Sequence, residues 1–173
     1  MSEWRVIDID PTREHWQTYL DHLKRVKMLT HATEDGDPKP DGFYFGILTE
    51  NECVGHISIR KQPLTVPASH LTEDKELPLS DSQCVPLVET FVNTFAVEKA
   101  YQRRGYGRAL QEAALKKTRE LGCYQMRSWS SADKSANYAL KLSMGFAVHP
   151  ALYPLPGGKP LSGVYFTKVI VNE

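Results

Sequence analysis

The feature that most constrains the fold is residues 87–122, where a strand pattern changes into a helix pattern. Leu87 to Val97 is a continuous run rich in β-branched and aromatic residues, which predicts a buried strand. Gly107 to Leu121 carries apolar residues at helical spacing, and Gly122 follows as a stop signal. Between them lies the turn Gln102-Arg103-Arg104-Gly105-Tyr106-Gly107. The chain therefore predicts a strand, a tight glycine turn and a helix in direct succession.

Further strands and helices are expected around this unit. Trp4 to Ile9 alternates apolar and polar residues, as in a strand, and Asp10-Pro11 is a helix-start signal before an amphipathic segment that runs to about Leu29. The expected strands are 4–9, 43–48, 53–60, 87–97, 124–130, 146–149 and 163–171, and the expected helices are 10–29, 107–121 and 135–144. This order predicts an α+β fold with a mixed sheet, in one domain over residues 1–173.

Residues 61–86 interrupt the pattern. They hold prolines at positions 63, 67, 78 and 86, and their acidic residues outnumber the basic ones. We expect a long loop inside the domain, and such loops are usually functional or disordered. Its acidic charge would attract a cationic amine, although a charged loop is more often simply solvated.

The composition excludes several classes of protein. Lysine plus arginine is 21 and aspartate plus glutamate is 21, so the chain lacks the positive surplus that nucleic acid or an anionic membrane surface demands. The three cysteines, Cys53, Cys84 and Cys123, show no metal-ligand spacing, so no metal is expected. The sequence has no signal-peptide pattern and no apolar run long enough for a membrane span. We therefore expect a cytoplasmic protein.

The turn at residues 102–108 predicts an anion site. The first N–H groups of a helix have no partner within the helix, and its dipole is positive there, so a diphosphate is the natural guest. Gly105 and Gly107 would leave the amides accessible, and Arg103, Arg104 and Arg108 add fork-shaped donors. The alternative is a plain strand-to-helix turn with solvated arginines. A dinucleotide-binding GxGxxG pattern is excluded because Leu110 occupies its third glycine position, and no Gly-Lys-Ser/Thr follows for a P-loop.

This turn resembles the Gln/Arg-x-x-Gly-x-Gly/Ala pyrophosphate loop of the GNAT superfamily of acetyl-CoA-dependent N-acetyltransferases. Two weaker similarities accompany it: Asn137 to Phe146 is similar to the family's helix that ends in Gly-Phe, and Val54-Gly55-His56-Ile57 to its Val-Gly-His strand. The similarity covers most of residues 43–171. It implies a mostly antiparallel central sheet with flanking helices, splayed where the cofactor enters.

The resemblance also implies a site. Acetyl-CoA would be the co-substrate, and the acetyl group would pass to an amine by direct transfer in a ternary complex. Asn137 would contact the pantetheine arm, and the acetyl group would bind main chain near the end of the central strand. The residues expected to bind the cofactor are Phe95, Ala96, Val97, Gln102, Arg103, Arg104, Gly105, Tyr106, Gly107, Arg108 and Asn137.

Acetyl transfer needs a base for the amine and an acid for the departing thiolate. Glu89 is the first candidate base, because strand parity places it with Phe95 and because the family often keeps a glutamate on this strand; Glu98 and His56 are weaker candidates. The family commonly places a tyrosine that acts as the general acid four residues before the glycine of Gly-Phe, where this chain has Lys141. Tyr138, one turn earlier, is the candidate replacement. The alternative for each is a purely structural role: a solvated charge for Glu89, a structural histidine for His56 and core packing for Tyr138.

Two other functions remain open at the level of sequence. One is a catalytically silent acyl-CoA-binding regulator of the same fold, suggested by Lys141 in the tyrosine position. The other is a binding module without coenzyme A. For the enzyme, we expect a small-molecule or peptide amine as acceptor and neither nucleic acid nor membrane as partner, and a homodimer is left open.

Overall fold

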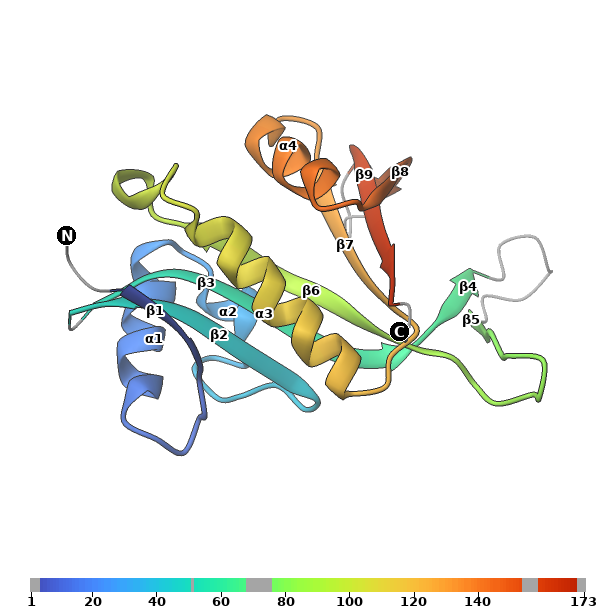
Figure 1. Ribbon diagram of the computed structural model, residues 1–173, viewed down its shortest axis with the longest axis horizontal. Coiled ribbons are helices and arrows are strands. Elements are labelled where there is room, and N and C mark those ends of the chain that lie inside the picture. Colours follow the sequence, from blue (N-terminus) through green and yellow to red (C-terminus); the bar gives the residue numbers. More distant parts are fainter. Residues whose placement is uncertain (1–3, 51, 68–75, 154–158, 171–173) are drawn as a thin grey trace.

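The computed structural model describes residues 4–50, 52–67, 76–153 and 159–170, and it has a seven-stranded sheet with helices on both faces (Figure 1). The strand order is β1-β2-β3-β6-β7-β9-β8, and every neighbouring pair is antiparallel except β6 and β7, which are parallel. The strands of this sheet are β1 Trp4–Asp8, β2 Gly42–Thr49, β3 Glu52–Pro63, β6 Val88–Val97, β7 Gln125–Ser131, β8 Ala147–Tyr153 and β9 Leu161–Val169. The predicted α+β class is confirmed.

Two apolar clusters lie on opposite faces of the sheet. Helix α1 (His15–Arg25) supplies Tyr19, Leu20 and Leu23 to one cluster, beside the short helix α2 (Leu29–Ala32). Helix α3 (Tyr106–Glu120) supplies Leu110 and other residues to the second and larger cluster. Helix α4 (Ser135–Ser143) follows β7. In Figure 1, α3 crosses the front of the sheet and α1 lies behind it.

Two local expectations are corrected. The helix expected over residues 10–29 begins only at His15, because the Asp10 side chain accepts hydrogen bonds from Thr12 and holds the preceding residues in a turn. The helix ends at Arg25, and Lys27 then adopts φ +58°, which separates it from the next helix. The segment 61–86 is also not simply a loop. β3 extends to Pro63, and β4 (Thr65–Pro67) pairs with β5 (Glu76–Pro78) in a small separate sheet. Residues 68–75 lie outside the described part.

The parallel strands β6 and β7 open into a splay. Their pairing runs from Glu89–Gln125 to Val92–Ser128 and stops there, although β6 continues to Val97 and β7 to Ser131. On its other edge, β6 carries a bulge: Val92 pairs with Ile59 and Thr94 with Ser58, so Asn93 has no opposite residue in β3. The end of β6 therefore has one paired edge and one edge that β7 leaves free.

Candidate active site

The turn after β6 forms an open helix N-terminus. A short 3-10 helix, Lys99–Tyr101, leads into it, and α3 begins at Tyr106 directly after Gly105. Gly105 adopts φ +85°, a left-handed conformation that favours glycine, and no side chain caps the helix. The first N–H groups of α3 therefore lack intrahelical partners and carry the positive end of the helix dipole. This geometry suits a diphosphate.

The two glycines of the turn serve different purposes. A Cβ added to Gly105 would meet no heavy atom within 4 Å, so the space beside this residue is open. A Cβ added to Gly107 would lie 3.3 Å from both Leu140 Cδ2 and Phe95 Cζ. Both glycines were expected to keep the approach to the amides clear. In the structure, Gly105 fits that expectation, whereas Gly107 lets α3 pack closely against α4 and the end of β6.

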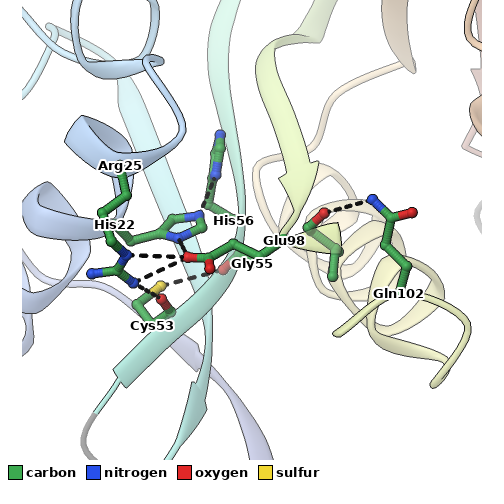
Figure 2. A network of polar contacts seen from close by, with 8 residues as sticks. His22, Arg25, Cys53, Gly55, His56, Glu98 and Gln102 are labelled. Atoms are coloured by element: carbon green, nitrogen blue, oxygen red, sulfur yellow. Dashed lines mark hydrogen bonds and ion pairs between the residues drawn. The ribbon is translucent and has the colours of Figure 1, made fainter. Parts of the chain in front are cut away.

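The polar side chains of the turn partly stabilise the turn itself. Gln102 donates from Nε2 to the Val97 carbonyl at 2.9 Å, which ties the turn back to the strand end (Figure 2). Arg104 donates to the Ala100 carbonyl at 3.2 Å and lies over the Tyr101 ring, and Arg108 donates to Ser143 Oγ at 2.8 Å. These arginines and Arg103 are all exposed, so they form a basic rim around the helix start.

The end of β6 consists of Phe95, Ala96 and Val97. On one edge these residues pair with β3, and on the other edge β7 leaves their backbone groups unpaired. All three are half-buried. Several buried polar atoms on the elements that flank the splay have no hydrogen-bond partner within the described part of the chain. They are Asn93 Nδ2 on β6, Ser128 Oγ and Trp129 Nε1 on β7, and Asn137 Oδ1 and Tyr138 OH on α4. Unpaired buried groups of this kind are uncommon and fit a site that a polar ligand completes.

Helix α4 holds both Tyr138 and Lys141. The Tyr138 ring packs edge-on against Phe166 with ring centroids 5.1 Å apart, while its hydroxyl is unpaired, so a role as proton donor is compatible with its position. Lys141 is 1% exposed; its Nζ donates to Gln111 Oε1 at 2.7 Å and lies 4.2 Å from the Phe146 ring centroid. Burial lowers the pKa of Lys141 to about 7.

Glu89 is fully buried in an ion pair between β6 and β7. Its Oε1 accepts from Arg127 Nε at 3.0 Å and from Gln62 Nε2 at 2.7 Å, and its Oε2 accepts from Gln125 Nε2 at 2.7 Å. It lies six residues before Phe95, roughly 20 Å along an extended strand. These contacts favour a structural role, and the assignment of Glu89 as a base stays a prediction.

The parity argument that placed Glu89 with Phe95 fails at the bulge. Val92 pairs with Ile59, and Thr94 pairs with the adjacent residue Ser58, so the strand changes face at Asn93. Glu89 and Phe95 therefore point to opposite faces of the sheet. A bulge leaves no clear mark in a sequence, so strand parity alone could not reveal this.

A polar network that runs from the surface to two buried histidines lies beside the turn on the α1 face (Figure 2). Glu98 directly follows β6; its Oε1 lies 2.8 Å from His22 Nδ1, and His22 Nε2 lies 2.8 Å from His56 Nδ1. Arg25 donates to Glu98 Oε1 at 3.1 Å and to the Cys53 carbonyl at 2.7 Å. Both histidines are completely buried, and His56 Nε2 has no partner within the described residues.

The sequence indicates Glu98 and His56 only as separate candidates and does not single out His22. The available signal was its helical spacing from Tyr19, which places a histidine on the buried side of α1. That spacing gives no indication of a partner on β3. The network joins residues that are 34 and 76 positions apart in the chain.

The chain belongs to the acetyltransferase (GNAT) family, whose family model matches residues 1–146. It is accordingly an acyltransferase, as the sequence predicted. No curated protein matches the chain significantly.

The fold is also similar to solved structures. Arabidopsis thaliana NAA60 in complex with acetyl-CoA has a TM-score of 0.72 at 14% identity, with 97% of this chain and 99% of that chain covered. A putative acyl-CoA N-acyltransferase from Klebsiella pneumoniae has 0.64 at 18%, covering 97% and 98%. The ribosomal-protein-S18-alanine N-acetyltransferase of Escherichia coli has 0.60 at 16%, covering 99% and 96%.

Two further findings concern only the described residues. None of their helices is both long and apolar enough to cross a membrane. They contain no group of three or more His, Cys, Asp or Glu side chains arranged to hold a metal ion.

Proposed function

We propose that this single-domain protein transfers the acetyl group of acetyl-CoA to a primary amine of a small molecule or protein, directly within a ternary complex. The observation that carries the proposal is the uncapped N-terminus of α3, which opens at Gly105 after the end of β6, where the edge of β6 toward β7 is unpaired. Free amides at a helix start can donate hydrogen bonds to charged phosphates, and free backbone groups at a strand edge can bind the carbonyl of a thioester.

Each part of the site has a proposed task. The amides of residues 102–108 hold the diphosphate, and Arg103, Arg104 and Arg108 neutralise its charge. The free edge at residues 95–97 orients the acetyl carbonyl. Asn137 binds the pantetheine arm, and the Tyr138 hydroxyl gives a proton to the departing thiolate. The unpaired atoms of both side chains support these assignments.

Two structural relatives support an amine as the acceptor. NAA60 has also been solved with a bisubstrate analogue, at a TM-score of 0.67 and 14% identity, and the Escherichia coli relative is named for an alanine of ribosomal protein S18. The acceptor of this chain is proposed only as a class. All three cysteines are free, which fits a reducing cytoplasm, and a homodimer stays a prediction.

The diphosphate site is tested by a matched pair of substitutions at Gly105. Asparagine and aspartate both tolerate a left-handed backbone and have nearly the same shape, and a Cβ at this position would meet no heavy atom within 4 Å, so Gly105→Asn and Gly105→Asp differ chiefly in charge. Acetyl-CoA should raise the melting temperature of the wild type and of Gly105→Asn, because it binds the folded state. Gly105→Asp should lose that shift. Equal shifts in the two variants would contradict the site.

Activity is tested separately by coenzyme A release from acetyl-CoA with a panel of amines. Amine-dependent release would support the transferase. A thermal shift without release from any amine would instead support a silent acyl-CoA-binding protein, the alternative that Lys141 suggests.

A further inference from the structure

The groups proposed to hold the cofactor lie on one face of the sheet. Tyr138 of α4 packs on Phe166, which belongs to the same apolar cluster as Leu110 of α3, so both helices lie on the α3 face. The diphosphate and the pantetheine arm are proposed to bind these two helices, and the cofactor therefore takes up that side of the splay. The amine is left the opposite side, the α1 face, from which to approach the acetyl carbon.

A row of arginines and aromatic rings crosses the α1 face at the closed end of the splay. Arg60 on β3 lies opposite Phe91 on β6, and Phe91 lies opposite Arg127 on β7. Residues opposite each other in a sheet project to the same face. Arg60 also shares strand parity with His56, which contacts His22 of α1. The row therefore stands on the α1 face.

The guanidinium groups alternate with aromatic rings along this row. Arg60 Cζ lies 5.7 Å and Arg127 Cζ lies 5.6 Å from the centroid of the Phe91 ring, and Arg127 Cζ lies 5.2 Å from the ring centroid of Tyr165 on β9. All three distances are within the range of cation–π contacts. These contacts restrict both arginine side chains, so less conformational entropy is lost when an anion binds to them.

The two arginines differ in how their charge is balanced. Arg127 is paired with the buried carboxylate of Glu89. Arg60 is exposed, and it has no acidic partner within the part of the chain that the structure describes. The row therefore carries one uncompensated positive charge. A carboxylate on Arg60 would balance it and would match the two parallel donors of a guanidinium group.

Aromatic rings continue from this row to the splay. Trp129 directly follows Ser128, the last residue of β7 that pairs with β6, and it lies opposite Tyr165 with its ring centroid 4.9 Å from that of Tyr153. Its parity with Arg127 places it on the α1 face. Trp129 and Tyr165 are half-buried and Tyr153 is 37% exposed, so part of this ring surface faces outward. An apolar chain can lie on it between the splay and the row.

The spacing of these parts sets the length of the acceptor. Phe91, which stands opposite Arg60, precedes Phe95 by four residues, roughly 13 Å along an extended strand. The Arg60 side chain reaches across part of this distance. An anion held by Arg60 and a nitrogen placed beside the end of β6 are therefore separated by on the order of 10 Å.

We infer that the acceptor is an elongated amine that carries a carboxylate on the order of 10 Å from its nitrogen, and that Arg60 binds this carboxylate. The inference rests on the proposed function and names the acceptor class of that site. The amine nitrogen bonds to the acetyl carbon, and the C–S bond breaks with its electron pair passing to sulfur. The proton lost by the nitrogen balances the one gained by the thiolate, and the carboxylate takes no part in these bond changes.

The first test uses ω-amino acids of two lengths, each compared with its own carboxamide as the uncharged match. With acetyl-CoA, kcat/KM from coenzyme A release should be at least about tenfold higher for ω-aminocaprylate than for its amide, because this chain spans on the order of 10 Å. The chain of γ-aminobutyrate is too short to reach Arg60 and should show no such gain. A gain that is equal at both lengths would contradict the spacing.

The second test removes the cation that is proposed to read the carboxylate. In Arg60→Gln, the gain from the carboxylate should disappear, while the thermal shift with acetyl-CoA is retained. The matched control is Arg119→Gln, at an exposed arginine near the end of α3, which should keep the wild-type gain. Arg60→Glu should turn the preference toward octamethylenediamine, whose second ammonium would meet the new carboxylate. A gain that persists in Arg60→Gln would overturn the inference.

A peptide pair distinguishes the two sources of such an acceptor. Ala-Gly-Gly-Asp and Ala-Gly-Gly-Asn, both with amidated C-termini, place a carboxylate or its neutral match at a similar distance from the amine. A gain confined to the amino acids identifies a small-molecule acceptor, and one confined to the peptides identifies a protein amino terminus. Coenzyme A release without a gain in either series would overturn the inference and leave the transferase intact. Absence of release with every amine would instead remove the proposed function itself.

Discussion

Lowering the pH below the ordinary pKa of histidine should destabilise the fold through His56. In the unfolded chain, this side chain titrates near 6.5, whereas in the folded protein burial and His22 lower its pKa to about 3. Between these two values, the unfolded state binds a proton that the folded state does not. The free energy of unfolding must therefore fall as the pH falls through this window, and it must be largest above pH 6.5.

The size of the effect follows from the width of the window. One pH unit of complete difference in binding is worth about 1.36 kcal/mol, and the unfolded side chain is half protonated at pH 6.5, so moving from pH 7.5 to 5 removes about 2 kcal/mol through His56 alone. The pKa of His22 is also lowered, so it acts in the same direction. Since domains of this size are usually stable by about 5–15 kcal/mol, the loss is readily measured.

Urea unfolding at pH 7.5, 6.5, 5.5 and 5 measures this loss directly, and His56→Gln is the control. The wild type should lose stability across the series, and the variant should lose about 2 kcal/mol less between pH 7.5 and 5. The reasoning would be refuted by a wild type whose free energy of unfolding is constant over this range, or by a variant with the same slope.

Other changes address the remaining features of the site. Lys141→Met should stabilise the protein at pH 7 by ~2 kcal/mol in urea unfolding. The free-energy cost of burying an amine, which lowers its pKa to about 7, is larger than the cost of losing its hydrogen bond to Gln111; an equal or lower stability would contradict this. Glu89→Gln should lower stability by about 3 kcal/mol by removing the charge that balances Arg127, with little change in kcat per folded molecule; stable protein with reduced turnover at low pH would instead support Glu89 as the base. Arg104→Ala should raise the KM for acetyl-CoA several-fold at low salt and less at high salt, as measured by coenzyme A release.

The strand-turn-helix unit was predictable because its signals are local. The apolar run before Val97, the glycines of the turn and the helical spacing after it each depend on near neighbours. Helix α3 accordingly spans Tyr106–Glu120, one residue from the expected bounds at each end, and Gly105 adopts the left-handed conformation that glycine permits. Local signals of this kind survive folding because the tertiary structure does not oppose them.

The environments of the ionisable side chains were not predictable from local signals. Glu89 receives hydrogen bonds from Gln62, Gln125 and Arg127, which are 27, 36 and 38 positions away. Its face is set by a bulge whose presence depends on pairing with β3. The His22–His56 contact likewise requires α1 to pack on β3. Each of these contacts becomes visible only when the register of the sheet is known.

The ion pair between Glu89 and Arg127 and the splay between β6 and β7 lie in the same strand pair, and each depends on the other. Parallel strands that continued to pair beyond Val92 would close the edge of β6 that a thioester needs. Only a few residue pairs join the strands, so a strong contact must hold them at the closed end, and Glu89 and Arg127 provide it at the first and third pairs. A weaker anchor would let β7 move away from β6 along the unpaired part of the two strands. We therefore expect substitutions at this anchor to widen the opening and to weaken acetyl-CoA binding through the geometry of the strand pair.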